Sequence, residues 1–335
     1  MDINTVAFEL LAGLLAVYAA LDGFDLGVGV LSLFARSKEE RDYYLAAVAP
    51  VWDGNEVWLL ASGNVLFGAF PVVFATVFSG FYLALVLVLL ALVARAVSIE
   101  FRELRHTSRW IRTWDWAFGV GSLVPALLFG VAVGNVLRGL PIGPDFSWRG
   151  SFVGLFNPYA LLVGLVSCAF FVMHGALYLR RKTSGELSSH LARIAFGASL
   201  AFIALYFAAT AATAYVAPAL FRKTGSPSFW ALTLLLLATL TTVPVATRAG
   251  RAALAFTASA ATVALMVALA AFSVYPLLVP SSLGNELSLT IYNAASTAGT
   301  LRTMLLVAFA GLPFIVGYTV VVYRVFRGPA RPAEE

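Results

Sequence analysis

A charged surface and a cysteine framework are both missing from this sequence. Only 12% of its 335 residues are charged, about half the share found in soluble domains, whereas 61% are hydrophobic. Its single cysteine, Cys168, lies in an apolar run, which excludes a disulfide framework and a thiolate metal site. The N-terminal MDINTVAFEL lacks the basic stretch of a signal peptide, so we expect the first apolar run to remain as a helix. This composition predicts an integral membrane protein.

Long apolar runs fill the sequence and predict an all-α, polytopic membrane protein. Runs of about 20 apolar residues cross a bilayer as helices, and their continuity argues against the alternation of a β-barrel. We predict a single transmembrane domain over residues 1–335. Its nine expected helices cover residues 6–34, 44–69, 72–97, 114–137, 157–180, 191–217, 229–248, 252–278 and 301–326. The second and third are divided at Phe70-Pro71, because proline suits the start of a helix.

Lysine and arginine are distributed unevenly between the connections. Of the 22 basic residues, 17 lie in or beside the connections after the first, third, fifth and seventh spans or in the C-terminal tail. Such residues concentrate in cytoplasmic loops, which predicts an outside N-terminus and a cytoplasmic C-terminus. The net charge of +5 is thereby explained without a nucleic-acid partner. The longest connection, about 279–300, is expected to be an outer loop without regular structure.

Four acidic residues interrupt the first two predicted spans. Asp22 and Asp25 in LDGFDLGVG, and Asp53 and Glu56 in APVWDGNEVW, are each three residues apart and share a helix face. At 1.5 Å per residue, each pair should lie roughly 14–18 Å from the inner end of its span. Ionisable residues at this depth are costly. The pattern therefore predicts a path for protons, or a cation site, that is entered from the cytoplasm.

Other polar residues near the inner side have structural explanations. Arg95 and Arg102 could pair with the four acids, which would then only hold the bundle together. Glu100 and Arg102 in SIEFREL, and Asp115 between two tryptophans, are expected to be interfacial anchors or contacts to lipid or another subunit. His174, the only histidine within a span, is expected to be a packing residue. Because a bis-histidine haem needs paired histidines at membrane depth, no haem is expected to be bound firmly by this chain alone.

Six motifs follow one another from the first predicted helix to the last. They are LDGFDLGVGVL, APVWDGNEVWLL, FSGFYLALVLVL, TWDWAFGVGSLVPALLFGVAVGNVL, FNPYALLVGLVS and VPSSLGNELSLTIYNAAS. Together they resemble subunit II of the cytochrome bd-type quinol oxidases. The resemblance implies two four-helix bundles, at 6–137 and 157–278, with a peripheral ninth helix at 301–326. It also implies a complex of the prokaryotic plasma membrane that oxidises quinol and reduces O2 to water with cytoplasmic protons.

The resemblance also implies cofactors, partners and site residues. Haems b558, b595 and d are expected chiefly on the partner, subunit I, and a small accessory transmembrane subunit and a bound quinone or lipid are further expectations. Acids of the family's proton route correspond to Asp22, Asp25 and Asp53. The family's arginine after the third span and the aspartate of its WDW motif correspond to Arg102 and Asp115. Glu56 stands where some members have glutamine, and Asn293 where some relatives have aspartate, so an acid role is not implied at either position.

Two other functions are compatible with acids inside a helical bundle. A proton- or cation-coupled transporter would need a substrate cavity at broken helices, usually related by an inverted repeat, and no repeat is recognisable here. In a purely structural assembly subunit, the acids would only pair with basic groups. Replacing Asp22 or Asp53 by asparagine would then leave turnover intact while lowering the yield of the complex.

Overall fold

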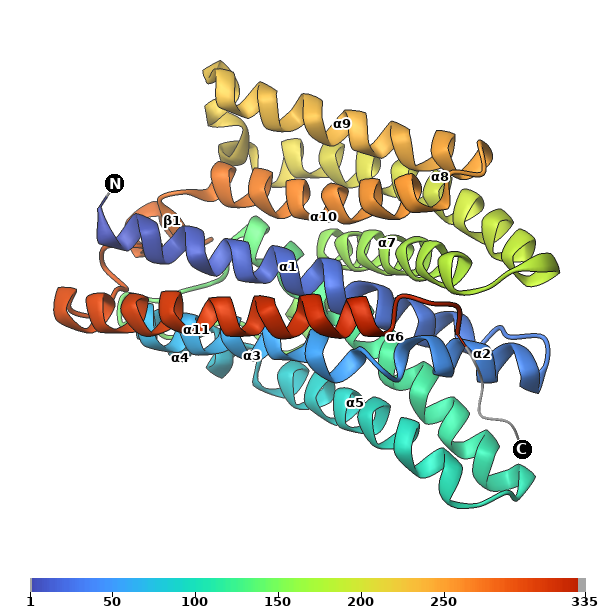
Figure 1. The fold of residues 1–335 in the computed structure, drawn as a ribbon. Coiled ribbons are helices and arrows are strands. Elements are labelled where there is room, and N and C mark those ends of the chain that lie inside the picture. Colours follow the sequence, from blue (N-terminus) through green and yellow to red (C-terminus); the bar gives the residue numbers. More distant parts are fainter. Residues whose placement is uncertain (1, 331–335) are drawn as a thin grey trace.

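The computed structural model describes residues 2–330 as a bundle of long helices that run side by side (Figure 1). Within these residues, eight helices are long and apolar enough to cross a membrane. They are α1 (Ile3–Ser32), α5 (Tyr82–Phe101), α6 (Ser108–Arg138), α7 (Pro158–Lys182), α8 (Gly185–Val216), α9 (Pro227–Arg248), α10 (Ala252–Val274) and α11 (Ala298–Val325). Two shorter helices, α3 (Trp52–Ala69) and α4 (Pro71–Gly80), meet that test only together, as a ninth crossing. The prediction of an all-α, polytopic membrane protein is confirmed.

Helix α1 begins at one end of the bundle, and α11 finishes at the other (Figure 1). We call them the Ile3 end, where α1 begins, and the Val325 end, where α11 finishes. Which end faces the cytoplasm stays a prediction. Arg331, one of the basic residues counted in the tail, lies outside the described residues, as do the last positions of the predicted 1–335 domain.

The boundary predicted at Phe70-Pro71 is present, but the third span starts later than expected. Pro71 opens α4, which is bent by 118° from α3, and α5 begins only at Tyr82. Residues 72–81, predicted to open a span, therefore belong mainly to a separate short helix at the Ile3 end. Proline has no N–H to continue the hydrogen bonding of α3, so the chain changes direction there.

The second predicted span, 44–69, was wrong at its start. An additional helix, α2 (Lys38–Val48), carries the charged KEERD sequence and is separated from α3 by a turn at residues 49–51. Pro50 explains the break, because proline has no N–H with which to continue the helical hydrogen bonding, and the last such bond here is from Ala49 N to Leu45 O. Asp53 consequently lies in the first turn of α3, at the Val325 end, and not about 14 Å inside a span as predicted.

The connection predicted to lack structure, 279–300, also differs from the expectation. Strand β1 (Leu277–Val279) pairs in antiparallel fashion with β2 (Leu289–Thr290), and Leu140 N donates to Pro280 O at 2.9 Å. This small sheet therefore joins the end of α6 to the segment between α10 and α11. The remaining short elements are the 3-10 helices η1 (Arg102–Leu104), η2 (Val153–Phe156), η3 (Pro218–Gly225) and η4 (Asn285–Leu287).

Helix α1 lies at the centre and contacts α3, α6, α7 and α10. Its backbone touches that of α7 at Gly27 and Gly175, where a Cβ on Gly27 would overlap the Phe171 carbonyl oxygen. Gly23, one turn earlier, lies against the Phe171 ring. Small residues let membrane helices approach this closely, as the Gly23–Gly27 spacing suggested. By contrast, α11 contacts mainly α3 and α1, and most of its surface is exposed.

Candidate functional site

Charged side chains from three helices meet inside the bundle. The Arg95 guanidinium of α5 donates through Nη2 to Asp22 Oδ1 of α1 at 2.8 Å and to Glu56 Oε1 of α3 at 2.5 Å. The Asp22 side chain is 0% exposed and that of Arg95 is 1% exposed, whereas 25% of the Glu56 side chain is exposed. Arg95 therefore joins two of the predicted acids, and these three residues form the centre of what we call the acid cluster.

Asp25 belongs to the same cluster through an amide that the sequence did not reveal. Asn55 Nδ2 donates to Asp25 Oδ2 at 2.7 Å and to Leu21 O at 3.3 Å. Asn55 Oδ1 accepts a hydrogen bond of 3.0 Å from the Tyr323 hydroxyl of α11. Tyr323 lies close to the Val325 end, so a chain of hydrogen bonds leads from that end to the buried carboxyl of Asp25.

Several buried atoms of this region have no hydrogen-bond partner among the described residues. They are Asp22 Oδ2, Asp25 Oδ1, Arg95 Nε and Nη1, and the Tyr18 hydroxyl. Buried polar atoms are normally paired, and a polar site that offers both donors and acceptors is suited to bound water. The acid cluster thus combines carboxyls with the hydrogen-bonding capacity that a proton relay requires.

Asp53 does not join these residues. It is exposed in the first turn of α3, and no described residue forms a hydrogen bond or ion pair with its carboxylate. It stands one turn before Glu56, on the side of the cluster that faces the Val325 end. Its predicted pairing with Glu56 on one helix face holds, while its predicted depth does not.

The interfacial residues form a second, separate network. Arg102 donates from Nε to Asp115 Oδ1 at 2.7 Å and from Nη2 to Asp42 Oδ1 at 2.5 Å. Arg41 adds a bond of 3.3 Å to Asp115 Oδ2. These bonds tie α2 and α6 to the end of α5, and Arg102 does not pair with the acid cluster. Glu100 is exposed and has no ion-pair partner among the described residues.

His174 is buried and both of its ring nitrogens are engaged. Nδ1 lies 2.7 Å from Ser259 Oγ, and Nε2 lies 2.9 Å from the carbonyl oxygen of Ala20. Its ring stacks on Phe256 at 4.8 Å between centroids. These contacts agree with the packing role expected for it. Within residues 2–330, no three histidine, cysteine or acidic side chains are placed to hold a metal ion.

Sequence reasoning missed Asn55 and Tyr323. Asn55 stands next to Glu56 in WDGNEVW, where a polar amide one position from an acid was an available signal. Tyr323 is 268 residues further along the chain, and nothing in its local sequence indicated this contact.

Comparison with known proteins gives consistent matches along the chain. A family model described as cytochrome bd terminal oxidase subunit II matches residues 3–326. The chain is 36% identical to cytochrome bd-I ubiquinol oxidase subunit 2 of Escherichia coli K12, over 94% of this chain and 92% of the relative. It is 33% identical to cytochrome bd ubiquinol oxidase subunit 2 of Bacillus subtilis, over 97% and 96%. The solved bd oxidase of Geobacillus thermodenitrificans shares the fold, with a TM-score of 0.76 at 17% identity over 97% of this chain and 99% of that one.

Proposed function

The chain belongs to the cytochrome bd terminal oxidase subunit II family, and from this premise we propose that it supports a haem-bearing subunit I and delivers cytoplasmic protons to it. Membership makes it a multi-pass subunit of a quinol-oxidising respiratory complex in the bacterial inner membrane. The observation that carries the proton role is the acid cluster, in which Asp22, Arg95 and Glu56 meet beside Asp25.

The charges of the cluster favour proton exchange. One guanidinium faces three carboxyls, those of Asp22, Asp25 and Glu56, which would leave a net negative charge if all were ionised. Uncompensated charge is expensive in a low-dielectric interior. Protons that enter the cluster therefore relieve charge, and an electron that arrives on a nearby haem would draw them onward for the same reason.

The proposed route begins at the Val325 end, which the distribution of basic residues predicts to face the cytoplasm. Asp53 is exposed at that end and precedes Glu56 by one turn. Asp25 and Asp22 lie further along α1 toward the Ile3 end and would pass protons on toward subunit I. The hydrogen bonds from Tyr323 through Asn55 offer a second connection between the Val325 end and Asp25.

The haems are proposed to reside on subunit I. Of the three histidines, only His174 is buried, and Ser259 and the Ala20 carbonyl occupy both of its nitrogens. His106 is exposed, and His190 lies near the start of α8, where the Arg36 guanidinium contacts its ring at 2.9 Å. These residues do not fit bis-histidine ligation of a b-type haem. Haems b558, b595 and d are thus assigned chiefly to the partner. A small accessory transmembrane subunit and a bound quinone or lipid remain part of the proposal.

One face of α3 is proposed to contact subunit I. This face is formed by residues that recur every three or four positions and are exposed or partly exposed: Asp53, Glu56, Leu60, Asn64 and Phe67. Polar and ionisable groups that face lipid are costly, so another protein surface is expected to cover them. Leu60 and Phe67 are 66% and 60% exposed and supply apolar area for that contact.

Gly63, on this same face, provides a test of the contact. A Cβ added there meets no atom of this chain within 4 Å, and the same is true of Gly197 on α8. Gly63→Leu is expected to clash with subunit I and to lower the haem recovered per chain at least about fivefold, since overpacking costs roughly 1–3 kcal/mol. Gly197→Leu is the matched control and should leave recovery unchanged. Equal recovery for both variants would contradict the assigned face.

The proposed function is tested by expressing this chain with its candidate subunit I and purifying through a tag on this chain. We expect haem to co-purify, visible in the reduced-minus-oxidised spectrum, together with cyanide-tolerant, quinol-driven O2 uptake. The control is the tagged chain expressed alone, which should carry no haem. A colourless chain that purifies stably by itself even when subunit I is present would overturn the proposal and favour the coupled transporter.

A further inference from the structure

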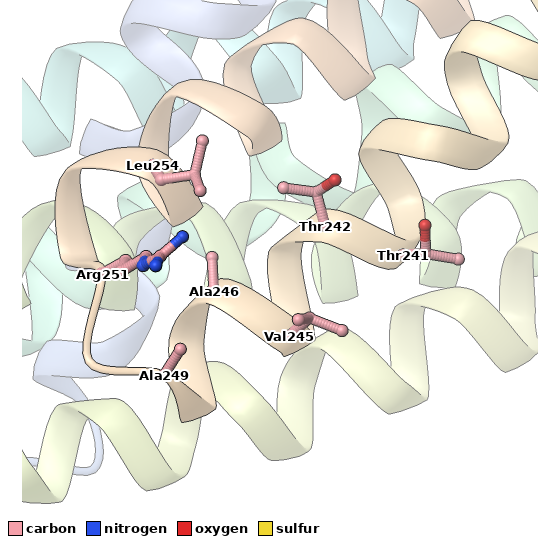
Figure 2. A pocket seen from close by; sticks show the side chains of 7 residues that line it. All are labelled: Thr241, Thr242, Val245, Ala246, Ala249, Arg251 and Leu254. Atoms are coloured by element: carbon pink, nitrogen blue, oxygen red, sulfur yellow. The ribbon is translucent and has the colours of Figure 1, made fainter.

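A pocket lies where α9 ends and α10 begins, at the Val325 end (Figure 2). Its volume is about 260 Å³. Figure 2 shows Arg251 at one end of the pocket and Thr241 and Thr242 at the other, with Ala246 between them and Leu254 alongside. Ala246 is buried and carries only a methyl group, so no long side chain fills the space between Arg251 and Thr242. None of the residues of the acid cluster lines this pocket, so it is a separate feature of the molecule.

Arg251 is a cation without a partner. Its side chain is exposed, and no described residue makes a hydrogen bond or ion pair with its guanidinium. Neighbouring basic residues are already engaged. Arg180 Nη1 donates to the Thr247 carbonyl at 3.0 Å, and the Arg248 guanidinium lies over the Phe196 ring at 4.2 Å. Arg251 is therefore available to a group from outside this chain.

The surroundings of the pocket favour an anion that also carries apolar chains. No aspartate or glutamate occurs from residue 187 to residue 285, so nothing on α9 or α10 repels a negative charge. The Thr242 hydroxyl donates to the Ala238 carbonyl at 2.7 Å, so the Arg251 guanidinium is the charged donor that the pocket offers to an anion. Val245 and Leu254, which are 67% and 44% exposed, provide apolar walls beside the arginine.

We propose that this pocket binds an anionic phospholipid. The phosphate would contact Arg251, and the first acyl carbons would lie against Val245 and Leu254. The ends of membrane helices lie at the level of the lipid headgroups, where basic residues attract anionic lipids. The pocket holds the headgroup and the beginning of the chains, while the remainder follows the outer surface of the two helices. This inference does not depend on proton delivery, and it uses the proposed orientation only to name the cytoplasmic leaflet.

Native mass spectrometry of the purified complex tests the proposal. The complex is titrated in detergent with phosphatidylglycerol and, separately, with zwitterionic phosphatidylcholine. Arg251→Gln is expected to weaken binding of the first phosphatidylglycerol about fivefold, the contribution of roughly one basic residue near a lipid surface. Arg251→Lys should bind like the wild type. Arg222→Gln removes an exposed arginine beyond the other end of α9 and is the matched control, with no change expected.

A second variant separates the pocket from the charge. Ala249→Leu keeps Arg251 but fills the pocket that Ala249 helps to line, and it should weaken phosphatidylglycerol as well. The haem spectrum of each variant shows that the complex is assembled. Unchanged affinity in Arg251→Gln, or an equal loss in Arg222→Gln, would overturn the proposal. So would an equal loss for phosphatidylcholine, or displacement of the lipid by free glycerol phosphate at similar concentration.

Discussion

Replacing Arg95 by methionine is expected to destabilise the protein by about 3–5 kcal/mol, the usual result of removing one partner from a buried ion pair. Arg95 is 1% exposed and serves both Asp22 and Glu56, so its loss leaves two carboxylates without a counter-charge. The measurement is the thermal unfolding midpoint in detergent, together with the yield of assembled complex. Methionine is chosen because it fills a similar space without charge.

Two further variants show whether the charge is responsible. Arg222→Met removes an exposed arginine and should leave the midpoint unchanged. Asp22→Asn combined with Arg95→Met removes the more deeply buried of the two carboxylates, so this double variant should be more stable than Arg95→Met alone. If the single and double variants unfold at the same temperature, the loss comes from packing, and the charge argument for the cluster fails.

Much of the fold could be predicted because hydropathy alone reports which segments enter a bilayer. The errors have local causes. Residues 44–51 are apolar enough to extend a span, but Pro50 lacks the N–H that would continue α2, and Asp53 therefore stands at the start of α3. Pro71 is correctly predicted as a helix start, but no local pattern indicates that the helix it opens is short and sharply bent from α3. Hydropathy records burial in lipid, whereas direction changes depend on tertiary contacts such as that of Gly80 with the Trp148 ring.

The candidate site was predictable in its acids and not in their partners. Spacing placed Asp22 and Glu56 at similar depth, and the structure joins both to Arg95. Spacing could not decide which arginine would do so, because Arg95 and Arg102 lie only two helical turns apart on α5 and η1. In the structure Arg102 is engaged by Asp115 and Asp42 outside the cluster, whereas Arg95 reaches Asp22 and Glu56. Contacts between distant helices are set by packing and leave no local pattern.

Asp25→Asn is expected to lower quinol-driven O2 uptake about 100-fold, within the range that a positioned proton-transfer group contributes. Asparagine keeps the shape of the side chain and can still accept the hydrogen bond from Asn55 Nδ2, so the fold and the haem content should be retained. The measurement is turnover per haem in the purified complex. Under the structural alternative, the same variant would reduce the amount of complex while each assembled enzyme kept its full turnover.

Glu56→Gln provides the internal comparison for that result. The glutamine carbonyl can still accept from Arg95 Nη2, so we expect the cluster to hold together and turnover to fall much less than in Asp25→Asn. Asp145→Asn changes an exposed acid in the α6–α7 connection and should have no effect. Equal turnover in Asp25→Asn and Asp145→Asn would exclude the acid cluster as a required proton path. A loss as large in Glu56→Gln would instead show that the charge next to Arg95 matters as much as the carboxyl of Asp25.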